Sequence, residues 1–562
     1  MYVSMSTSVG DRVLRRLLPR VTGLYRRSYN VKAGWKNPRS SYAVAPQVAD
    51  EYLHRILKAR IYEVVKMTPC NKAPSLSVQT GNDVHFKRED MQDVYSFKIR
   101  GAFNKIKGLT DEQRELGVIA CSAGNHAQGV ALSARALDIQ ATVVMPLATP
   151  NIKVDAVRRH GGDNVTVVLH GQNYDECSAE AYRLRDENNL TLIHPYDDPD
   201  VIAGQGTIGM ELMQQMDDID AVFLCCGGGG LLAGVASYIK ALKPNIKIIG
   251  CEADDAAGMT ASLIMDEVTT LPTVGLFADG AAVRTVGTET FRICRELVDE
   301  MVTVNTDEIC AAIKAGFNDT RGIMEPAGAL AIAGLTKYVR ENEWEGKNVV
   351  AICSGANIDF DRLRFVTQRA DSREVLMSVD IPDRPGQFLK MYELVAPRNV
   401  TGLSYRFDGT ATAKLFLTFQ VPTSFDVEDD ATTVKNVLEA AGMPALNLQT
   451  NEMAKAHGRY LSGGRVRIEN EMRGFTESLY RFEFPEAPGA LSNFLRVLHE
   501  NNDGRWSITL FHYRNHGHDF GRVLVGLVVP DGEQAYFDEF LNNLGYVHFQ
   551  ETENPVYEQF LR

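Results

Sequence analysis

The sequence lacks any uninterrupted apolar run that approaches the roughly 20 residues needed to cross a bilayer, so we expect no membrane-spanning segment. It also lacks a Cys-x-x-Cys pair, and its nine cysteines, an odd number, all lie between Cys70 and Cys353. This pattern favours reduced thiols in an intracellular enzyme over a disulfide framework or a zinc site. We therefore expect no bound metal.

Basic residues are outnumbered, because 59 lysines and arginines face 72 aspartates and glutamates, which gives a formal net charge of −13. An acidic balance argues against nucleic acid as a partner. The hydrophobic fraction of 44% is that of a globular protein. Because 562 residues exceed what one ordinary core can bury, the composition predicts several domains.

Acidic residues are nearly missing from the N-terminal segment, where Asp11 is the only acid before Ala45. The basic residues there are Arg12, Arg15, Arg16, Arg20, Arg26, Arg27, Lys32, Lys36 and Arg39. Frequent Ser and Thr without a long apolar core are typical of an organelle transit peptide, and they exclude a secretory signal. We interpret residues 1–46 as a transit peptide for the mitochondrion, with the plastid as the alternative. A disordered basic tail is the competing interpretation.

Strand-like and helix-like patterns alternate from about Val48 to Gln368, which predicts a mostly parallel sheet with helices on both faces. We assign residues 47–370 to this α/β region. The expected strands are residues 84–87, 118–121, 143–146, 165–169, 221–226, 246–251 and 348–353, and the expected helices include residues 175–188, 231–242 and 307–315.

The stretch Ser96-Phe97-Lys98-Ile99-Arg100-Gly101 follows a predicted strand and opens a predicted helix, with Ser96 as its expected N-cap. Lys98 would then lie in the first turn, where the positive end of the helix dipole favours the neutral amine. A lysine kept partly neutral can form a Schiff base with a carbonyl cofactor. By itself, however, a lone helical lysine is far more often a solvated surface residue.

Three further stretches follow predicted strands. Ser122-Ala123-Gly124-Asn125-His126 offers backbone N–H groups and short polar side chains that suit a carboxylate, although a capped turn fits equally well. Ser354-Gly355-Ala356-Asn357 lies where open α/β sheets bind ligands, although an ordinary loop is also possible.

The third stretch is the glycine run Gly227, Gly228, Gly229 and Gly230, followed by Leu231 at the start of a helix. It fits a phosphate-binding loop, but it is not a P-loop because no Lys-Ser/Thr follows. A dinucleotide fingerprint is the rival interpretation, since Gly228-x-Gly230-x-x-Ala233 fits loosely and Glu252 ends the next strand. The loop alone leaves both open.

Taken together, these motifs resemble those of the fold-type II pyridoxal-phosphate enzymes, and most of all the biosynthetic threonine dehydratases. The resemblance runs from about Asp50 to the C-terminus and keeps the order of the motifs. It implies pyridoxal 5′-phosphate as the cofactor, with Lys98 as the catalytic residue and cofactor anchor and Phe97 beside it. It also implies that Asn125 contacts the ring hydroxyl and Ser354 the pyridine nitrogen. The phosphate would rest on Gly227, Gly228, Gly229, Gly230 and Leu231, and the substrate carboxylate on Ser122, Ala123, Gly124 and His126.

Past Asp371 the cysteines vanish and an internal repeat appears. Residues 378–388 are echoed by residues 480–491, and each copy predicts the order βαββα, over residues 374–447 and 477–550, with a polar connector at 448–476. The repeat resembles the ACT-like regulatory domains of threonine dehydratases, which implies amino-acid effectors. A purely structural, oligomerising pair is the alternative.

The resemblance implies dehydration and deamination of L-threonine to 2-oxobutanoate and ammonia in isoleucine biosynthesis. It further implies isoleucine as feedback inhibitor, valine as opposing effector and a homotetramer. Four alternatives stay open: a catabolic serine/threonine dehydratase or serine racemase, a β-replacement transferase of the cysteine synthase type, a non-catalytic amino-acid sensor, and a nicotinamide dehydrogenase. The first usually lacks a doubled C-terminal region, and the intact Lys98 disfavours the sensor.

Overall fold

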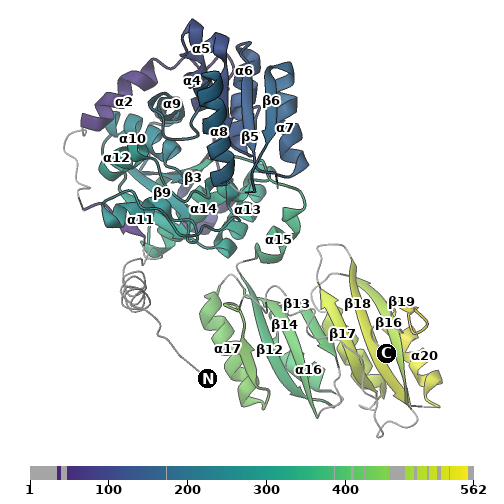
Figure 1. Cartoon of the computed structure of the whole chain (residues 1–562). Helices are drawn as coiled ribbons and strands as arrows, with labels where there is room; N and C mark the ends of the chain where they lie inside the picture. The colour runs from purple at the N-terminus through teal and green to yellow at the C-terminus, as the bar shows by residue number, and fades with distance from the viewer. Residues whose placement is uncertain are drawn as a thin grey trace, which may run out of the picture. The chain divides into compact units, whose positions relative to one another are not determined.

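The structure is a computed structural model that describes residues 34–38, 47–147, 149–172, 174–371, 373–384, 386–406, 411–422, 424–451, 454, 475–485, 490–502, 506–514, 520–530 and 532–554. The chain divides into two compact units, Met1–Ser372 and Arg373–Arg562, which Figure 1 colours from purple to green and from green to yellow. Most of the predicted transit peptide and connector lie outside the described residues.

The first unit contains a seven-stranded sheet in the order β1-β10-β9-β8-β11-β3-β2. The five inner strands run parallel, and an antiparallel strand pairs with each outer one. Strands β8 and β10 are buried at every position, as expected for strands covered on both faces. The strands are β1 (Trp35–Lys36), β2 (Cys70–Lys72), β3 (Asp83–Arg88), β8 (Ala221–Cys225), β9 (Lys247–Ala253), β10 (Glu300–Val304) and β11 (Asn348–Cys353).

A second, four-stranded sheet in the same unit is entirely parallel and has the order β6-β5-β4-β7. Its two faces carry separate apolar clusters: Val143 and Met145 of β5 pack toward α6 and α7, whereas Val144 packs toward α8. The alternation of side chains along a strand thus places helices on both faces. The strands are β4 (Val118–Cys121), β5 (Ala141–Met145), β6 (Val165–Leu169) and β7 (Thr191–Leu192).

Helix ends in the first unit follow capping rules. Thr110 and Asn305 each form a capping box, and Asp198 accepts two backbone N–H bonds ahead of Pro199. The helices are α2 (Gln47–Leu57), α3 (Pro74–Thr80), α4 (Lys98–Lys107), α5 (Asp111–Leu116), α6 (Asn125–Ala136), α7 (Asn151–Gly161), α8 (Tyr174–Asn188), α9 (Pro199–Gln215), α10 (Gly230–Leu242), α11 (Gly258–Met265), α12 (Thr288–Leu297), α13 (Thr306–Thr320), α14 (Pro326–Glu341) and α15 (Arg362–Arg369), with short 3-10 turns that include η2 (Glu89–Met91), η3 (Gly162–Asn164) and η4 (Asp279–Ala281).

The folded part of the first unit begins earlier than the sequence predicted. Trp35 and Lys36 pair with β10, inside the segment assigned to the transit peptide. Asn37 is buried and donates from its backbone to Asp299 O at 2.8 Å and from its side chain to Val298 O at 2.8 Å. A short folded segment, residues 34–38, therefore lies within the range interpreted as a transit peptide, and it has no periodic pattern that would reveal it in the sequence.

The second unit is built from two repeats that share one antiparallel sheet, in the order β15-β12-β14-β13-β17-β18-β16-β19. Each repeat shows the predicted order βαββα and adds a short final strand at the sheet edge. The first comprises β12 (Glu374–Pro382), α16 (Gln387–Val395), β13 (Asn399–Arg406), β14 (Thr412–Gln420), α17 (Val427–Ala440) and β15 (Ala445–Asn447). The second comprises β16 (Phe475–Pro485), α19 (Ala490–Asn502), β17 (Ser507–Arg514), β18 (Phe520–Pro530), α20 (Gln534–Leu544) and β19 (Val547–Gln550).

The repeats meet at β13 and β17, where Ser404 pairs with His512 and the flanking pairs are symmetric about that position. Both strands shift register at a threonine, Thr401 in β13 and Thr509 in β17. The two threonines donate to equivalent glutamates of the first strand in their repeat, Glu374 and Glu477. The unit therefore has an internal near-twofold axis that passes between Ser404 and His512.

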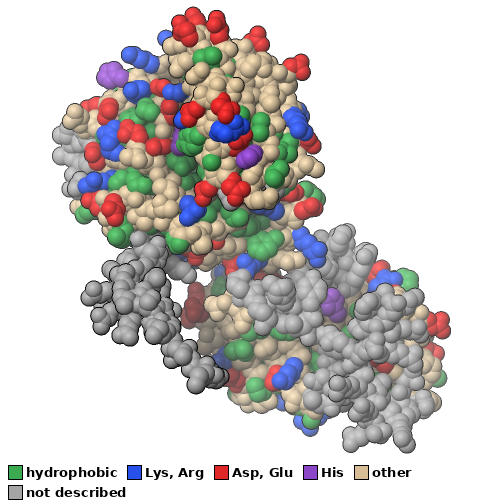
Figure 2. Space-filling view, in the orientation of Figure 1, with side chains coloured by type: hydrophobic (Ala, Val, Ile, Leu, Met, Phe, Trp, Pro, Cys, Tyr) green, Lys and Arg blue, Asp and Glu red, His purple; other side chains and the backbone are tan. Residues whose placement is uncertain are grey.

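The outer surface carries charges of both signs. On the face shown in Figure 2, acidic and basic side chains are interspersed over the first unit. Among the described residues, no helix combines the length and the apolar character that a bilayer crossing requires.

Candidate active site

Lys98 is the first residue of α4, at the carboxyl edge of the seven-stranded sheet. The prediction that Ser96 caps this helix is wrong, because Phe97 occupies the N-cap position without a side-chain cap. Ser96 instead forms a β-bridge with Gly355, two residues before the helix begins. The backbone N–H of Phe97 donates to Ser354 O at 3.1 Å, so the chain just before Lys98 is fastened to the segment that follows β11.

The Lys98 amine is partly buried and has a defined partner. Nζ donates to the carbonyl oxygen of Pro195 at 2.8 Å and lies 5.3 Å from the centroid of the Phe97 ring. Burial lowers the pKa of Lys98 to about 8, against the opposing influence of Cys225 and Glu325. The sequence argument attributed a neutral amine to the helix dipole, but removal from water is the main cause in the structure.

The position of α4 depends on close contact with its neighbours. A Cβ on Gly101 would lie 2.7 Å from the carbonyl oxygen of Val201 in α9, and a Cβ on Gly129 of α6 would lie 3.2 Å from the backbone of Lys98. A side chain at Gly101 would clash with α9, and one at Gly129 would crowd the backbone of Lys98. The motif glycine Gly101 therefore allows α4 to pack closely against α9.

The glycine run forms the turn between β8 and α10. Gly229 is the N-cap of α10 with a φ of 96°, a left-handed conformation that favours glycine. Among the described residues, no protein acceptor pairs with the backbone N–H groups of Gly227, Gly228 or Gly229. Free amides at a helix N-terminus suit a phosphate. Gly230 and the buried Leu231 form the first turn of α10, so the glycine run leads from the strand directly into the helix.

Tyr196 connects the glycine loop to the lysine. A Cβ on Gly228 would overlap the Tyr196 ring, and the residue before Tyr196 is Pro195, the partner of Lys98. The Tyr196 hydroxyl donates to Thr285 O at 3.1 Å, which holds the ring in place. The sequence analysis did not identify Tyr196, because nothing in its surroundings distinguishes it from an ordinary loop aromatic.

Ser354 is buried and follows β11. Its Oγ accepts a hydrogen bond from the Cys225 thiol at 3.2 Å and donates to Ala327 O at 3.3 Å. The strand β11 lies between β8 and β3, so Ser354 lies at the same sheet edge as the glycine loop and the turn that precedes Lys98. The site residues predicted from three separate motifs therefore converge.

Asn125 is the first residue of α6, and both ends of its amide have partners. Nδ2 donates to Glu325 Oε1 at 2.5 Å, and Oδ1 accepts from Asn357 Nδ2 at 2.7 Å. Burial raises the pKa of Glu325 to about 7. Glu325 makes no ion pair among the described residues. Sequence analysis missed Glu325, which lies 200 residues from Asn125, and assigned no role to Asn357.

The loop before α6 offers backbone donors. The amides of Asn125, His126 and Ala127 occupy the first turn, and no acceptor among the described residues pairs with them. Ser122 Oγ accepts from the Gly124 N–H at 3.3 Å, which shapes the loop around Ala123. Such a turn suits a carboxylate.

The His126 side chain differs from the expected carboxylate ligand. Its Nε2 lies 2.8 Å from Ile193 O, and because a carbonyl oxygen only accepts, Nε2 carries the hydrogen. Burial lowers the pKa of His126 to about 3, so Nδ1 is unprotonated and cannot donate. The backbone N–H of His126, and not its ring, is therefore the group available to an anion.

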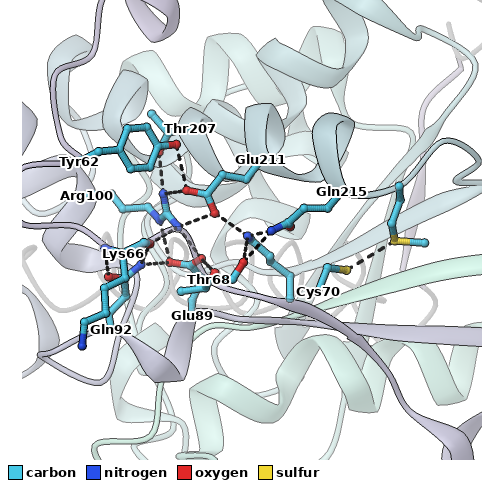
Figure 3. Close-up of polar contacts among 12 residues, drawn as sticks. Tyr62, Lys66, Thr68, Cys70, Glu89, Gln92, Arg100, Thr207, Glu211 and Gln215 are labelled. Atoms are coloured by element: carbon cyan, nitrogen blue, oxygen red, sulfur yellow. Dashed lines mark hydrogen bonds and ion pairs between the residues drawn. The ribbon is translucent and has the colours of Figure 1, made fainter.

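A network of buried ion pairs holds α4 in place (Figure 3). Arg100 donates to Glu89 at 2.7 Å and to Glu211 at 2.6 Å, and Lys87 donates to Glu211 at 2.5 Å, all without exposure to solvent. Two cations face two carboxylates, so the network is neutral as a unit. Lys87 lies in β3, Arg100 in α4 and Glu211 in α9, so the network joins these three elements at a point two residues beyond Lys98.

These residues fit pyridoxal phosphate. The glycine cradle with free amides suits its phosphate, the amine of reduced pKa suits its aldehyde, and the polar groups of Asn125 and Ser354 suit its ring. The dinucleotide alternative fits less well, because Glu252 accepts from the amides of Met259 and Thr260 at 2.8 and 2.9 Å. That carboxylate caps α11 and is not open to a ribose. Among the described residues, no group of three or more His, Cys, Asp or Glu side chains is placed to hold a metal ion.

Fold and site thus define a pyridoxal-phosphate-dependent enzyme with a separate C-terminal unit. The chain matches the family described as pyridoxal-phosphate dependent enzyme over residues 61–355. It matches the C-terminal regulatory domain of threonine dehydratase over residues 367–457 and 470–561.

Full-length relatives agree with both matches. The chain is 47% identical over 531 residues to a mitochondrial threonine dehydratase of Saccharomyces cerevisiae, with 91% of this chain and 89% of the relative covered. It is 46% identical over 520 residues to the biosynthetic L-threonine dehydratase of Escherichia coli, with 92% and 98% covered. The processed form of threonine deaminase isoform 2 from Solanum lycopersicum superposes with a TM-score of 0.58 at 47% identity, covering 60% of this chain and 97% of that one.

The chain belongs to the pyridoxal-phosphate-dependent enzymes and, within them, to the threonine dehydratase family. The predicted fold class and cofactor are confirmed. Roles of individual residues remain predictions.

Proposed function

We propose that this protein is a threonine ammonia-lyase that converts L-threonine to 2-oxobutanoate and ammonia as the first step of isoleucine biosynthesis. The proposal rests above all on the combination, in one chain, of the Lys98 site with a regulatory unit of two repeats. Relatives that share both parts over about nine-tenths of the chain are named threonine dehydratases.

The Lys98 amine is the group proposed to move the proton. Pyridoxal phosphate, when bound, joins an amine through its aldehyde and draws electrons from the α-carbon of an amino acid. With a pKa of about 8, Lys98 is neutral in a useful fraction near neutral pH and can accept the Cα proton. The carbonyl of Pro195, at 2.8 Å, gives the amine a fixed partner and direction.

The other residues are proposed to hold the cofactor and the substrate and to determine which reaction follows. The free amides around Gly227, Gly228 and Gly229 would hold the phosphate, and those of the first turn of α6 the substrate carboxylate. Ser354 offers a neutral hydroxyl to the ring nitrogen, whereas a carboxylate there would keep that nitrogen protonated. A neutral partner makes a weaker electron sink, which favours prompt loss of the β-hydroxyl over racemisation or transamination.

The alternatives predict different products. A catabolic serine/threonine dehydratase or serine racemase would prefer serine and ignore isoleucine. A β-replacement transferase would require a second substrate. A sensor would lack turnover, and a dehydrogenase would lack the absorbance of bound pyridoxal phosphate.

For regulation, we propose isoleucine as the inhibitor, valine as the opposing effector and a homotetramer as the assembly. The match of the C-terminal unit to a regulatory domain supports effector binding in general. The near-twofold junction of the repeats supports a ligand that bridges them, because small changes there move both halves of one sheet.

We propose that the protein acts in the mitochondrion. Relatives from Saccharomyces cerevisiae and Schizosaccharomyces pombe are named mitochondrial, which agrees with the predicted transit peptide. A tomato relative is named chloroplastic, which fits the plastid alternative.

The test is a 2-oxobutanoate assay on the full chain with threonine alone, with serine, and with threonine plus isoleucine. We expect threonine turnover that isoleucine inhibits and valine restores. Lys98→Ala should lose turnover and the visible absorbance of the bound cofactor. Retained turnover in Lys98→Ala would reject the site, and turnover that ignores isoleucine would reject the proposed regulation only.

A further inference from the structure

Two cysteines outside the proposed site lie next to one another. Cys121 is the last residue of β4, and Cys177 lies in the first turns of α8. Their sulfur atoms are 3.3 Å apart, although the residues are 56 positions apart in the chain. Among the described residues, which include all nine cysteines, no other two cysteine sulfurs make such a contact.

The surroundings keep the pair in place. Both thiols belong to a small apolar cluster between the four-stranded sheet and α8, which also contains Ile119, Val144 and Ala181. Cys177 has no exposed surface and Cys121 retains 6%. No metal ligand accompanies them, since no His, Asp or Glu among the described residues completes a group with these sulfurs.

The contact divides the pair into a donor and an acceptor. The Cys121 thiol donates to the Cys177 sulfur, and this hydrogen bond lowers the pKa of Cys177 and raises that of Cys121. The first proton lost by the pair therefore leaves a thiolate on Cys177. A thiolate is the reactive form of cysteine, and a second sulfur at 3.3 Å is placed to resolve whatever forms on the first.

We propose that Cys121 and Cys177 are a dithiol modification site that small hydroperoxides convert to a disulfide. The Cys177 thiolate attacks the peroxide oxygen, an S–O bond forms as the O–O bond breaks, and the alcohol or water leaves with one proton. The Cys121 sulfur then attacks Cys177, the S–S bond forms, and the oxygen leaves as water with the Cys121 proton. Two thiols are oxidised by two electrons in total, and one hydroperoxide is reduced.

The geometry favours this reaction and also limits the reagents that can reach it. A disulfide needs about 2.05 Å between sulfurs, so the pair must close by roughly 1.2 Å, which a helix turn packed on a strand end can absorb. Tyr174 is half exposed at the start of α8, and the pKa of its phenol is raised first by burial and then by the nearby Cys121. Opening of the first turn of α8 would admit a peroxide but not a bulky reagent.

The bridge would act on a functional loop. Cys121 is followed directly by Ser122, which begins the loop proposed to hold the substrate carboxylate, and the Ser122 N–H donates to Val144 O at 3.2 Å. A disulfide would pull the last residue of β4 toward α8. It would therefore displace the point from which that loop begins. The inference does not depend on the proposed function, because disulfide formation is measured on the protein itself.

The experiment exposes the full-length protein to hydrogen peroxide, blocks remaining thiols under denaturing conditions, and maps cysteine peptides by mass spectrometry. Cys70 is the internal control, because it is the least buried cysteine and burial raises its pKa to about 11. We expect a Cys121–Cys177 cross-linked peptide that dithiothreitol reverses and that forms before Cys70 is oxidised.

Two variants separate the roles. In Cys121→Ser the hydroxyl still donates to Cys177 but cannot resolve it, so a dimedone probe should trap a sulfenic acid at Cys177. In Cys177→Ser, Cys121 loses the neighbouring sulfur with which it would form the disulfide, so no cross-linked peptide that dithiothreitol reverses should form. If the wild-type pair stays reduced at peroxide concentrations that oxidise Cys70, or up to those that unfold the protein, the proposal is wrong.

Discussion

Asn125 donates from Nδ2 to Glu325 Oε1 at 2.5 Å, which joins the first turn of α6 to the N-cap residue of α14 across 200 residues of sequence. Asn357 donates to the other end of the same amide, so the amide cannot rotate. The second N–H of the Asn125 amide has no acceptor among the described residues. Glu325 is the acid on which this arrangement depends.

The first prediction concerns the pH dependence of stability caused by Glu325. Its pKa is raised from 4.5 to about 7, so across that window the unfolded chain releases a proton that the folded chain retains. Stability therefore falls as pH rises through the window, by up to about 3 kcal/mol, and is constant above it. Glu325→Gln removes the titration, so its unfolding midpoint should change less than wild type between acidic and neutral buffers. Parallel pH profiles of the two proteins would contradict the assignment.

The second prediction concerns the capture of the cofactor by Lys98. Because only the neutral amine reacts with an aldehyde, the rate at which the cofactor-free protein binds pyridoxal phosphate should rise with pH around a midpoint of about 8. Stopped-flow absorbance follows the reaction, and Lys98→Ala should show no slow spectral change. A midpoint near the ordinary lysine value of about 10.4 would show that burial does not act on this amine.

The third prediction compares two glycines of positive φ. Gly229 has a φ of 96° and a Cβ there would come within 2.9 Å of Thr290, whereas Gly346 has a φ of 66° with open space around it. Both Gly229→Ala and Gly346→Ala cost about 1 kcal/mol of backbone strain. Only Gly229→Ala should weaken pyridoxal phosphate binding, by about tenfold or more, as measured by equilibrium titration. Equal losses of pyridoxal phosphate affinity in both variants would mean that backbone strain alone is responsible.

The fourth prediction addresses the chemistry of Ser354. Ser354→Asp places a carboxylate beside Ala327 O and the Cys225 thiol in a buried position. We expect slower oxo-acid formation together with new products of racemisation or transamination, because the ring becomes a deeper electron sink. Chiral chromatography of the recovered amino acid detects them. Faster dehydration without side products would refute this role. The control Ser354→Thr keeps a hydroxyl and should form no products of racemisation or transamination.

The fifth prediction concerns the ion network behind α4. Arg100→Met leaves Glu89 and Glu211 buried with one cation instead of two, and should lower the free energy of unfolding of the first unit by about 3–5 kcal/mol. Arg183, which pairs with Glu180 and Glu187 on the exposed face of α8, provides the matched control, and Arg183→Met should change stability little. Denaturant unfolding compares the two variants. Similar unfolding midpoints would contradict the stabilising role of the ion network.

The local features of the site were predictable because they follow from strand and loop patterns. The runs that became β6 and β11 are mostly apolar, with one polar residue in each, and have the predicted bounds, residues 165–169 and 348–353. Parallel strands bring their carboxyl ends to one edge, so the loops after them had to meet near Lys98. The glycine run predicted its own turn because few other sequences allow a φ of 96° before a helix.

What could not be predicted depends on long-range packing. Glu325 acquires its role from a contact 200 residues away, and no local spacing reports such a partner. Ser96 had the chemistry of an N-cap, but its backbone pairs with Gly355 and the helix starts too late to use it. His126 had the chemistry of an anion ligand, but Ile193 already accepts the only hydrogen on its ring.

The axis between Ser404 and His512 relates two halves that are not copies. A hydroxyl on one side corresponds to an imidazole on the other, and Thr418 in the first half corresponds to Gly526 in the second. One small molecule therefore cannot meet the same surroundings twice within this polypeptide. The two sides of the axis in this regulatory unit are therefore chemically different environments, so the two repeats need not bind the same ligand equally well.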